Sequence, residues 1–195
     1  MLQLPEGRRC IKVLGIDPGT DTMGYAPLVL DTDTMQITGI GVHTYKAARD
    51  YKYKRSSVEY YGDKYTRFFL HADHLVELLE TFEPDYVIGE AIFHRRGRTQ
   101  AFRGLAECWM MIRSVCQRYR LTLPIEQIEP VPVKQNLGVG VGVGKRAELK
   151  DKLLVERAVL ARKDMTFDAD SHPDEHSYDA TAIGLYFIDN LLGLK

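Results

Sequence analysis

The sequence has no long hydrophobic run and few cysteines. No stretch of its 195 residues approaches the roughly 20 apolar residues needed to span a bilayer, so we expect no membrane segment. Residues 1–9 lack the basic-then-apolar layout of a secretion signal. The cysteines are odd in number and lack zinc-ligand spacing, which favours reduced, buried thiols in a cytoplasmic protein. They are Cys10, Cys108 and Cys116.

An excess of positive charge is also missing. The net charge is −1, which argues mildly against a nucleic-acid partner, because domains that bind nucleic acids are often strongly basic. The charge is unevenly distributed, however. Bases gather at 94–103 and 145–152, and acids gather at 77–85 and 164–175. Hydrophobic and charged fractions of 45% and 27% are ordinary for a globular protein, and the length predicts one domain over residues 1–195.

The hydrophobic pattern predicts an α/β fold. Three strands come first, as an antiparallel meander, at 11–17, 22–31 and 34–45. The later elements are a helix at 66–82, a strand at 85–90, a helix at 99–119, a strand at 123–129, and helices at 145–163 and 174–193. This order predicts one central, mixed, five-stranded sheet flanked by helices. The polar residues 46–65 are assigned to an irregular connection.

Three carboxylates stand out against apolar surroundings. Asp17 ends the apolar run 12–16, Glu90 ends the run 86–89, and Asp179 lies in an apolar helix. Open sheets of this kind place ligands at the carboxyl ends of their strands. Magnesium and manganese take oxygen ligands, and a pair of such ions commonly drives phosphodiester chemistry. We therefore expect the three acids to converge on divalent ions; the alternative is that each is an ordinary turn or strand-end residue.

Four motifs occur in a specific order. They are Gly-Ile-Asp-Pro-Gly-Thr at 15–20, Pro-Asp-Tyr at 84–86 leading to Glu-Ala-Ile-Phe at 90–93, Val-Lys-Gln at 133–135, and His-Ser-Tyr-Asp-Ala at 176–180. Each is weak alone, but four in order at similar intervals are specific. From about residue 11 to 188 the chain resembles the RuvC family of Holliday-junction resolvases, which have the ribonuclease-H-like fold.

The resemblance implies a structure-selective endonuclease that resolves four-way DNA junctions by symmetric, metal-dependent phosphodiester hydrolysis. Family members act as homodimers, and the implied cofactor is two Mg²⁺ ions per site, with Mn²⁺ as a substitute. The implied ligands are Asp17, Glu90, His176 and Asp179. Some relatives have aspartate where His176 stands, so its role as a ligand, a water-positioning group or a proton carrier stays open. Lys134 would contact the scissile phosphate.

The resemblance also implies DNA contacts after the second acid. Phe93 would insert at the junction centre, and the arginines near it would bind phosphates. A buried phenylalanine and a solvated turn are the alternatives. The full set of DNA-binding candidates is Phe93, Arg95, Arg96, Arg98, Arg103, Lys134, Lys145 and Arg146.

Three segments allow more than one interpretation. The glycine-rich residues 137–145 do not fit a phosphate loop, since Arg146 replaces the required Ser or Thr. Tyrosines and bases alternate within 46–65, which suits either nucleic-acid contact or a loop packed by its own tyrosines. The helix 99–119 carries more apolar side chains than one face buries, which predicts a dimer contact. These side chains are Phe102, Leu105, Trp109, Met110 and Ile112.

Other functions remain to be weighed. An actin- or Hsp70-like ATPase shares the Gly-Ile-Asp-x-Gly-Thr pattern, but it needs two such domains and this chain has room for one. Within DNA and RNA metabolism, the alternatives are a nuclease for forks, flaps or RNA and a non-catalytic junction-binding scaffold. The long connection at 44–67 and the low net charge favour a bacteriophage source, with activity in the cytoplasm of an infected host.

Overall fold

The computed structural model describes residues 9–50, 52, 54–92, 99–139, 145–191 and 193; of residues 99–101 and 145–151 it describes the backbone alone. The strands are β1 Cys10–Asp17, β2 Met23–Asp31, β3 Ile37–Gly39, β4 His43–Tyr45, β5 Tyr86–Glu90, β6 Ile125–Ile128 and β7 Met165–Phe167. The helices are α1 Ala47–Asp50, α2 Arg55–Phe82, α3 Thr99–Tyr119, α4 Pro130–Asn136, α5 Lys145–Leu160 and α6 Glu175–Leu191.

The strands form one mixed sheet in the order β6-β5-β1-β2-β3-β7, with β4 paired to β2. β1, β2 and β3 form the expected antiparallel meander, and β5 and β6 add parallel strands beside β1. The predicted mixed α/β sheet is therefore confirmed, although it has seven strands instead of five. The difference arises because the predicted third strand divides into β3 and β4 at Gly41, which has a φ of 58°, and because β7 is a short strand that the pattern does not reveal.

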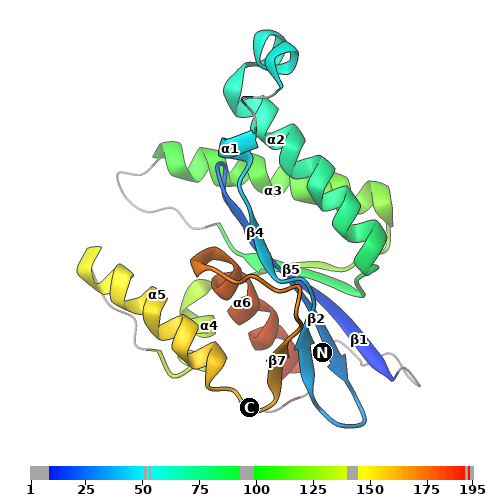
Figure 1. Ribbon diagram of the computed structural model, residues 1–195, viewed down its shortest axis with the longest axis vertical. Coiled ribbons are helices and arrows are strands. Elements are labelled where there is room, and N and C mark those ends of the chain that lie inside the picture. The colour runs from blue at the N-terminus through cyan, green and yellow to red at the C-terminus, as the bar shows by residue number, and fades with distance from the viewer. Residues whose placement is uncertain are drawn as a thin grey trace.

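Helices cover both faces of the sheet (Figure 1). Along β1, Ile11 and Val13 face α4, α5 and α6, whereas Leu14 and Ile16 face α2 and α3. Both faces are buried, which explains the nearly continuous apolar run of this strand. The alternation of side chains along β1 places Asp17 on the face that α6 covers.

The connection at 46–65 differs from its prediction. It is largely helical: α1 occupies part of it, and α2 begins at Arg55 instead of residue 66. Polar residues fill this first part of α2, so its sequence lacks the apolar periodicity by which a buried helix is recognised. Among the described residues, no helix is long and apolar enough to cross a membrane.

The cysteines are free thiols, as expected. Cys108 and Cys116 are buried in the core between the sheet and α2–α3, where burial raises the pKa of each thiol to about 12. Cys10, in contrast, is exposed at the start of β1, so the expectation of burial was wrong for this residue.

Candidate active site

Asp17 and Glu90 lie at the ends of neighbouring parallel strands. Ile16 of β1 pairs with Gly89 of β5, so the next residue of each strand is one of the two acids. Tyr86 and Ile88 pack in the core on the α6 side, and the alternation of side chains places Glu90 on that side too. The two acids therefore share one face and one edge of the sheet.

Helix α6 approaches this face closely because three glycines leave room for it. A Cβ at Gly15 would overlap the carbonyl oxygen of Ala180, and a Cβ at Gly24 would overlap that of His176. Gly184 on α6 is equally tight against the side chain of Leu28. The helix backbone therefore lies directly on β1 and β2, and its first turns reach the edge of the sheet where Asp17 lies.

His176 is fixed by contacts to both ring nitrogens. Its Nδ1 lies 2.9 Å from Asp17 Oδ2, and its Nε2 lies 3.2 Å from Thr22 Oγ1 and 3.5 Å from Glu175 Oε1. The hydrogen bond to Asp17 raises the pKa of His176 above its ordinary value, and burial opposes this effect. The histidine of the His-x-x-Asp pair is thus held directly against the first acid of the predicted site.

Asp179 lies one helical turn further along α6 and interacts with Asp17 through space. Burial raises the pKa of Asp179 well above its ordinary value, and the negative charge of Asp17 raises it further. Lys152, Lys134 and His176 oppose the rise. A nearly buried carboxyl group beside a second one is an arrangement that favours either a bound proton or a bound cation.

Two lysines approach Asp179 from different helices. Lys134 lies on α4, a short helix that the sequence analysis does not predict, and Lys152 lies on α5. Lys152 Nζ also lies 3.1 Å from Glu175 Oε1. The sequence places Lys152 in a basic cluster but gives no sign that its side chain reaches the acids, since this depends on how α5 packs against α6.

Asp174 caps the amino-terminal end of α6. Its Oδ1 accepts hydrogen bonds from the backbone N–H groups of His176, at 3.2 Å, and Ser177, at 3.4 Å, and from the hydroxyl of Thr44. Burial raises the pKa of Asp174, but the hydrogen bond from Thr44 and those from the backbone outweigh it and lower the pKa overall. The cap also places a negative charge at the positive end of the helix dipole.

Trp109 supports the second acid from the other side of the sheet. Its indole N–H donates a 2.9 Å hydrogen bond to the backbone carbonyl of Glu90, and a Cβ at Gly89 would lie 2.7 Å from its ring. Trp109 and Ile112 are buried within the chain. The expectation that these two residues form a dimer contact is therefore wrong, and of the five apolar residues of that helix only Met110 is strongly exposed, at 71%.

The donor set fits a hard divalent cation. Asp17, Glu90 and Asp179 supply carboxylate oxygens, which magnesium and manganese prefer; burial, and after it the charge of Asp17, raise the pKa of Asp179, and a bound cation would offset both effects. In the described part of the chain, however, no three His, Cys, Asp or Glu side chains already enclose a metal position. Asp17 instead contacts His176, so cation binding would require these side chains to rearrange.

Several predicted DNA contacts cannot be placed. Phe93, Arg95, Arg96 and Arg98 lie outside the described residues, as do residues 140–144 of the glycine-rich segment. The side chains of Lys145 and Arg146 are likewise outside them, at the start of α5. Arg103 is described: it is exposed on α3 and its Nε lies 3.2 Å from Glu107 Oε1.

The chain has a ribonuclease-H-like fold, with Asp17 and Glu90 at the ends of neighbouring strands. No model of a protein family matches the chain. It is 29% identical over 161 residues, 82% of this chain and 88% of the relative, to the crossover junction endodeoxyribonuclease RuvC of Thermomicrobium roseum. The resemblance to RuvC that the four motifs indicate is thereby confirmed.

Solved structures of junction resolvases share the fold. RuvC of T. thermophilus in complex with a Holliday junction substrate has a TM-score of 0.63 and 18% identity, covering 94% of this chain and 97% of that one. The yeast mitochondrial Holliday junction resolvase has a TM-score of 0.57 and 13% identity, covering 94% and 80%. The fowlpox virus resolvase, in complex with a Holliday junction, has a TM-score of 0.53 and 14% identity, covering 93% and 99%.

Proposed function

We propose that this protein is a divalent-metal-dependent endonuclease that resolves four-way DNA junctions. The observation that carries the proposal is the meeting of β1, β5 and α6: Asp17 and Glu90 share one face and edge of the sheet, and Asp179 is close enough to Asp17 for their charges to interact. The similarity to RuvC supports the reaction class and favours it over the ATPase alternative.

The chain's own residues would hold and position the scissile phosphate. Asp17, Glu90 and Asp179 would bind Mg²⁺, with Mn²⁺ as a substitute; two such ions supply an activated water and charge stabilisation at the leaving oxygen. His176 orients Asp17, and Lys134 and Lys152 add positive charge near a phosphate bound beside Asp179. Water attacks phosphorus as the bond to the 3′ oxygen breaks, which leaves 5′-phosphate and 3′-hydroxyl ends.

A homodimer is the second part of the proposal. Two identical sites related by a two-fold axis match the symmetry of a four-way junction and explain how paired nicks are made. Trp109 and Ile112 are buried and do not contribute to such a contact, whereas Met110 remains exposed on α3. Sedimentation velocity at micromolar concentration tests this part separately, because a monomeric mass would exclude the dimer. A bacteriophage source rests on the sequence arguments alone.

One nuclease panel tests the reaction. Purified protein is incubated with synthetic four-way, three-way, fork and linear DNA, each with Mg²⁺, Mn²⁺ or EDTA, and the products are mapped on both strands. We expect paired symmetric nicks in the four-way junction, dependent on metal and absent in Asp17→Asn, which should still bind the junction. Equal cutting of forks and three-way junctions would indicate a broader branched-DNA nuclease. Tight binding without cutting of any substrate would instead indicate a scaffold.

A further inference from the structure

The amino-terminal part of α2 projects from the body of the protein. We call residues 54–69 the α2 arm. Helix α2 is interrupted at Gly62, whose φ of 76° and ψ of 167° are not helical. The hydroxyl of Thr66 donates a 3.0 Å hydrogen bond to the carbonyl of Gly62 and stabilises the bend. Figure 1 shows the arm extending beyond the sheet and the other helices.

Four aromatic side chains of the arm are exposed to solvent. The exposed fractions are 86% for Tyr60, 58% for Tyr61, 52% for Tyr65 and 47% for Phe69. Tyr61 packs edge-on against Phe69 across the bend, with ring centroids 5.1 Å apart, and leaves Tyr60 uncovered. So much exposed aromatic surface on one projecting element is typical of an interaction site. The rings also contact one another, with centroids 6.3 Å apart for Tyr60 and Tyr61 and for Tyr65 and Phe68, so the alternative of a segment packed by its own tyrosines holds in part, while Tyr60 stays 86% exposed.

Residues 46–69, which include the arm, carry an excess of positive charge, although the chain as a whole does not. Between residues 46 and 69 there are seven Lys or Arg and three Asp or Glu, whereas the whole chain has a net charge of −1. Lys54 and Arg55, where the arm begins, are exposed. Bases beside exposed aromatic rings complement a single nucleic-acid strand, because phosphates are held by charge and unpaired bases stack on the rings.

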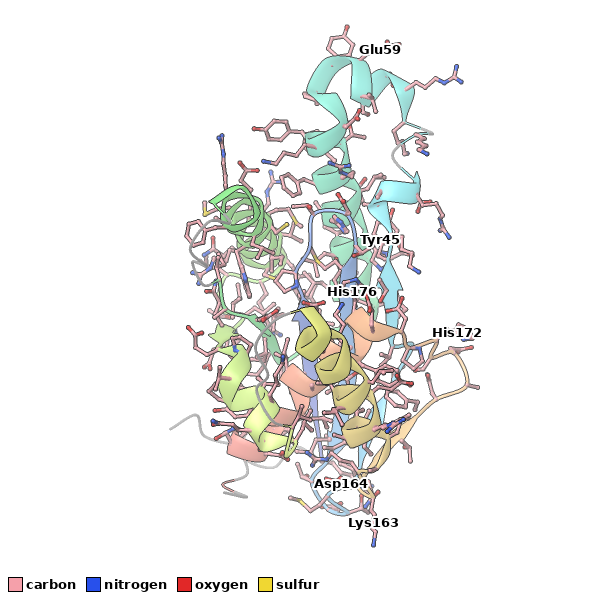
Figure 2. The ribbon with its side chains drawn as sticks, turned by 90° about the vertical axis from the view of Figure 1, so that its left-hand side faces the viewer. Tyr45, Glu59, Lys163, Asp164, His172 and His176 are labelled. Carbon is pink, nitrogen blue, oxygen red and sulfur yellow. The ribbon has the colours of Figure 1, made fainter. Side chains whose placement is uncertain are left out.

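The base of the arm is attached to the candidate active site. Arg67 Nε lies 3.4 Å from Asp21 Oδ1, in the loop that follows β1. The neighbouring residue in that loop, Thr22, contacts His176. Figure 2 places Glu59 at the far end of the arm and His176 nearer the middle of the molecule, with Lys163 at the opposite end. The arm therefore rises from the edge of the sheet that carries the acids.

We propose that the α2 arm binds unpaired nucleotides of a DNA branch beside the active site. Tyr60 and Tyr65 provide stacking surfaces for bases, and Lys54 and Arg55 contact the phosphates of the same strand. The inference rests on the proposed function only in that DNA is the ligand; it adds that the ligand is single-stranded and names where it lies. A fully paired duplex offers no free base faces, so it gains nothing from the tyrosines.

The test compares paired and unpaired DNA. Fluorescence anisotropy measures the Kd of the full-length protein, in EDTA, for a 20-nucleotide oligothymidylate, a four-way junction with unpaired thymidines at its centre, and a paired duplex. The double variant Tyr60→Ala/Tyr65→Ala should bind the two probes with unpaired bases about ten-fold or more weakly and the duplex less than about two-fold more weakly. Tyr60→Phe/Tyr65→Phe keeps the rings and should bind all three like the parent.

Two further variants separate charge from stacking. Lys54→Ala/Arg55→Ala should lower the slope of log Kd against log salt by about one to two. This change should be the same for the paired and the unpaired probes, because phosphate contacts do not depend on free bases. Leu121→Ala is the matched control. Leu121 is 82% exposed and precedes β6, the outermost strand on one side of the sheet, so the variant should have the same Kd values as the parent.

The outcomes separate this inference from the proposed function. An unchanged Kd of Tyr60→Ala/Tyr65→Ala for oligothymidylate would overturn the role of the arm, even if the protein cuts junctions. A fall from dimeric to monomeric mass in that variant, with unchanged Kd, would show that the arm contacts a second copy and would also overturn it. Selective loss of binding to unpaired bases supports the inference, and it does so even if no junction is cut by the parent protein.

Discussion

His176 Nδ1 lies 2.9 Å from Asp17 Oδ2, so the histidine of α6 directly holds the carboxylate that ends β1. The second ring nitrogen contacts Thr22, which fixes the plane of the imidazole. This geometry assigns His176 first to the orientation of Asp17.

Removing His176 should slow cutting without weakening DNA binding. We expect His176→Ala to reduce the single-turnover rate on a saturating four-way junction about 10–100-fold, the usual effect of losing a residue that orients a ligand. His176→Asp places a carboxylate oxygen at this position and should retain more activity than the alanine variant. The control is the Kd for the same junction in EDTA, which should not change. A wild-type rate in His176→Ala would show that His176 has no role in cutting and only occupies the end of a helix.

Gly24 should tolerate no side chain. A methyl group there would overlap the backbone carbonyl of His176, which cannot move without displacing the first turn of α6. We expect Gly24→Ala to lower the free energy of unfolding by about 1–3 kcal/mol and to depress cutting beyond that loss of stability. Urea denaturation and single-turnover cleavage provide the two measurements.

Gly104 provides the matched control for that substitution. It lies within α3, and a methyl group there would meet only the side-chain methyl of Thr20, at 3.0 Å. Gly104→Ala should therefore leave the stability unchanged or raise it slightly, because alanine favours a helix over glycine. If both variants behaved alike, close approach at Gly24 would not be what positions α6.

The parts of the site that could be predicted are those fixed by strand order and motif. Asp17 and Glu90 follow apolar runs, so their place at strand ends is readable from the sequence. The supporting contacts are not readable in this way. Lys152 lies near enough to Asp179 for their charges to interact only because α5 packs on α6. Helical periodicity does not show that Gly89 leaves space for the ring of Trp109, which the sequence analysis counts among the apolar residues of a dimer contact.

The fold was predicted best where apolar residues are dense. The helix 99–119 was placed at its observed bounds, whereas the arm of α2 was missed. Its helix is mostly solvated, so its sequence lacks a buried stripe, and Gly62 interrupts it. The short strand β7 was missed because three residues carry too little pattern, and its pairing with β3 depends on tertiary structure.

Trp109→Phe should weaken the site through the backbone of Glu90. The substitution keeps an aromatic ring near Gly89 but removes the hydrogen bond to the Glu90 carbonyl, a loss of about 0.5–1.5 kcal/mol. We expect lower stability in urea and a several-fold slower cleavage rate. Gln117→Ala, on the same helix but exposed, should change neither. Unchanged cleavage in Trp109→Phe would mean that the hydrogen bond only stabilises the fold.

Acid should destabilise the fold through the buried histidines of α2. Burial lowers the pKa of His71 to about 4, from an ordinary value of 6.5. The folded state accommodates the neutral form of His71. The contribution of this form to the free energy of unfolding is therefore fully present above pH 6.5 and is lost as the pH falls toward 4. At most this amounts to roughly 3 kcal/mol. Burial also lowers the pKa of His74 to about 4. The Nε2 atom of His74 lies 2.7 Å from the Nε2 atom of His43.

His71→Leu tests this pH dependence. The free energy of unfolding in urea is measured at pH 7, 5.5 and 4.5 for the parent and the variant. The carboxylates titrate in both, so the difference between the two curves isolates His71. We expect the parent to lose more stability than the variant between pH 6.5 and 4. Parallel curves would show that His71 does not change its protonation on unfolding.

Arg162 is hydrogen-bonded to Asp164 and Asp189, and Figure 2 places Asp164 at the end of the molecule opposite the α2 arm. Its guanidinium donates to both carboxylate oxygens of Asp189, at 2.8 and 2.9 Å, and to Asp164, at 2.6 Å. The side chain of Asp189 is only 10% exposed, and Asn136 is its other hydrogen-bond donor, at 2.7 Å. Loss of the guanidinium would therefore leave a nearly buried carboxylate with one neutral partner.

Arg162→Met should consequently lower the free energy of unfolding by about 3–5 kcal/mol, the usual effect of removing one member of a buried ion pair. Lys163→Met alters an exposed neighbour and should have almost no effect. The double variant Arg162→Met/Asp189→Leu should regain much of the stability, because no charge is left buried. Asp189 lies near the carboxyl end of α6, whereas the candidate active site lies at the amino-terminal end of this helix. The folded Arg162→Met variant should therefore cut junctions at the parent rate. A slower rate at a temperature where the variant is fully folded would mean that this ion pair also sets the position of α6 over Asp17.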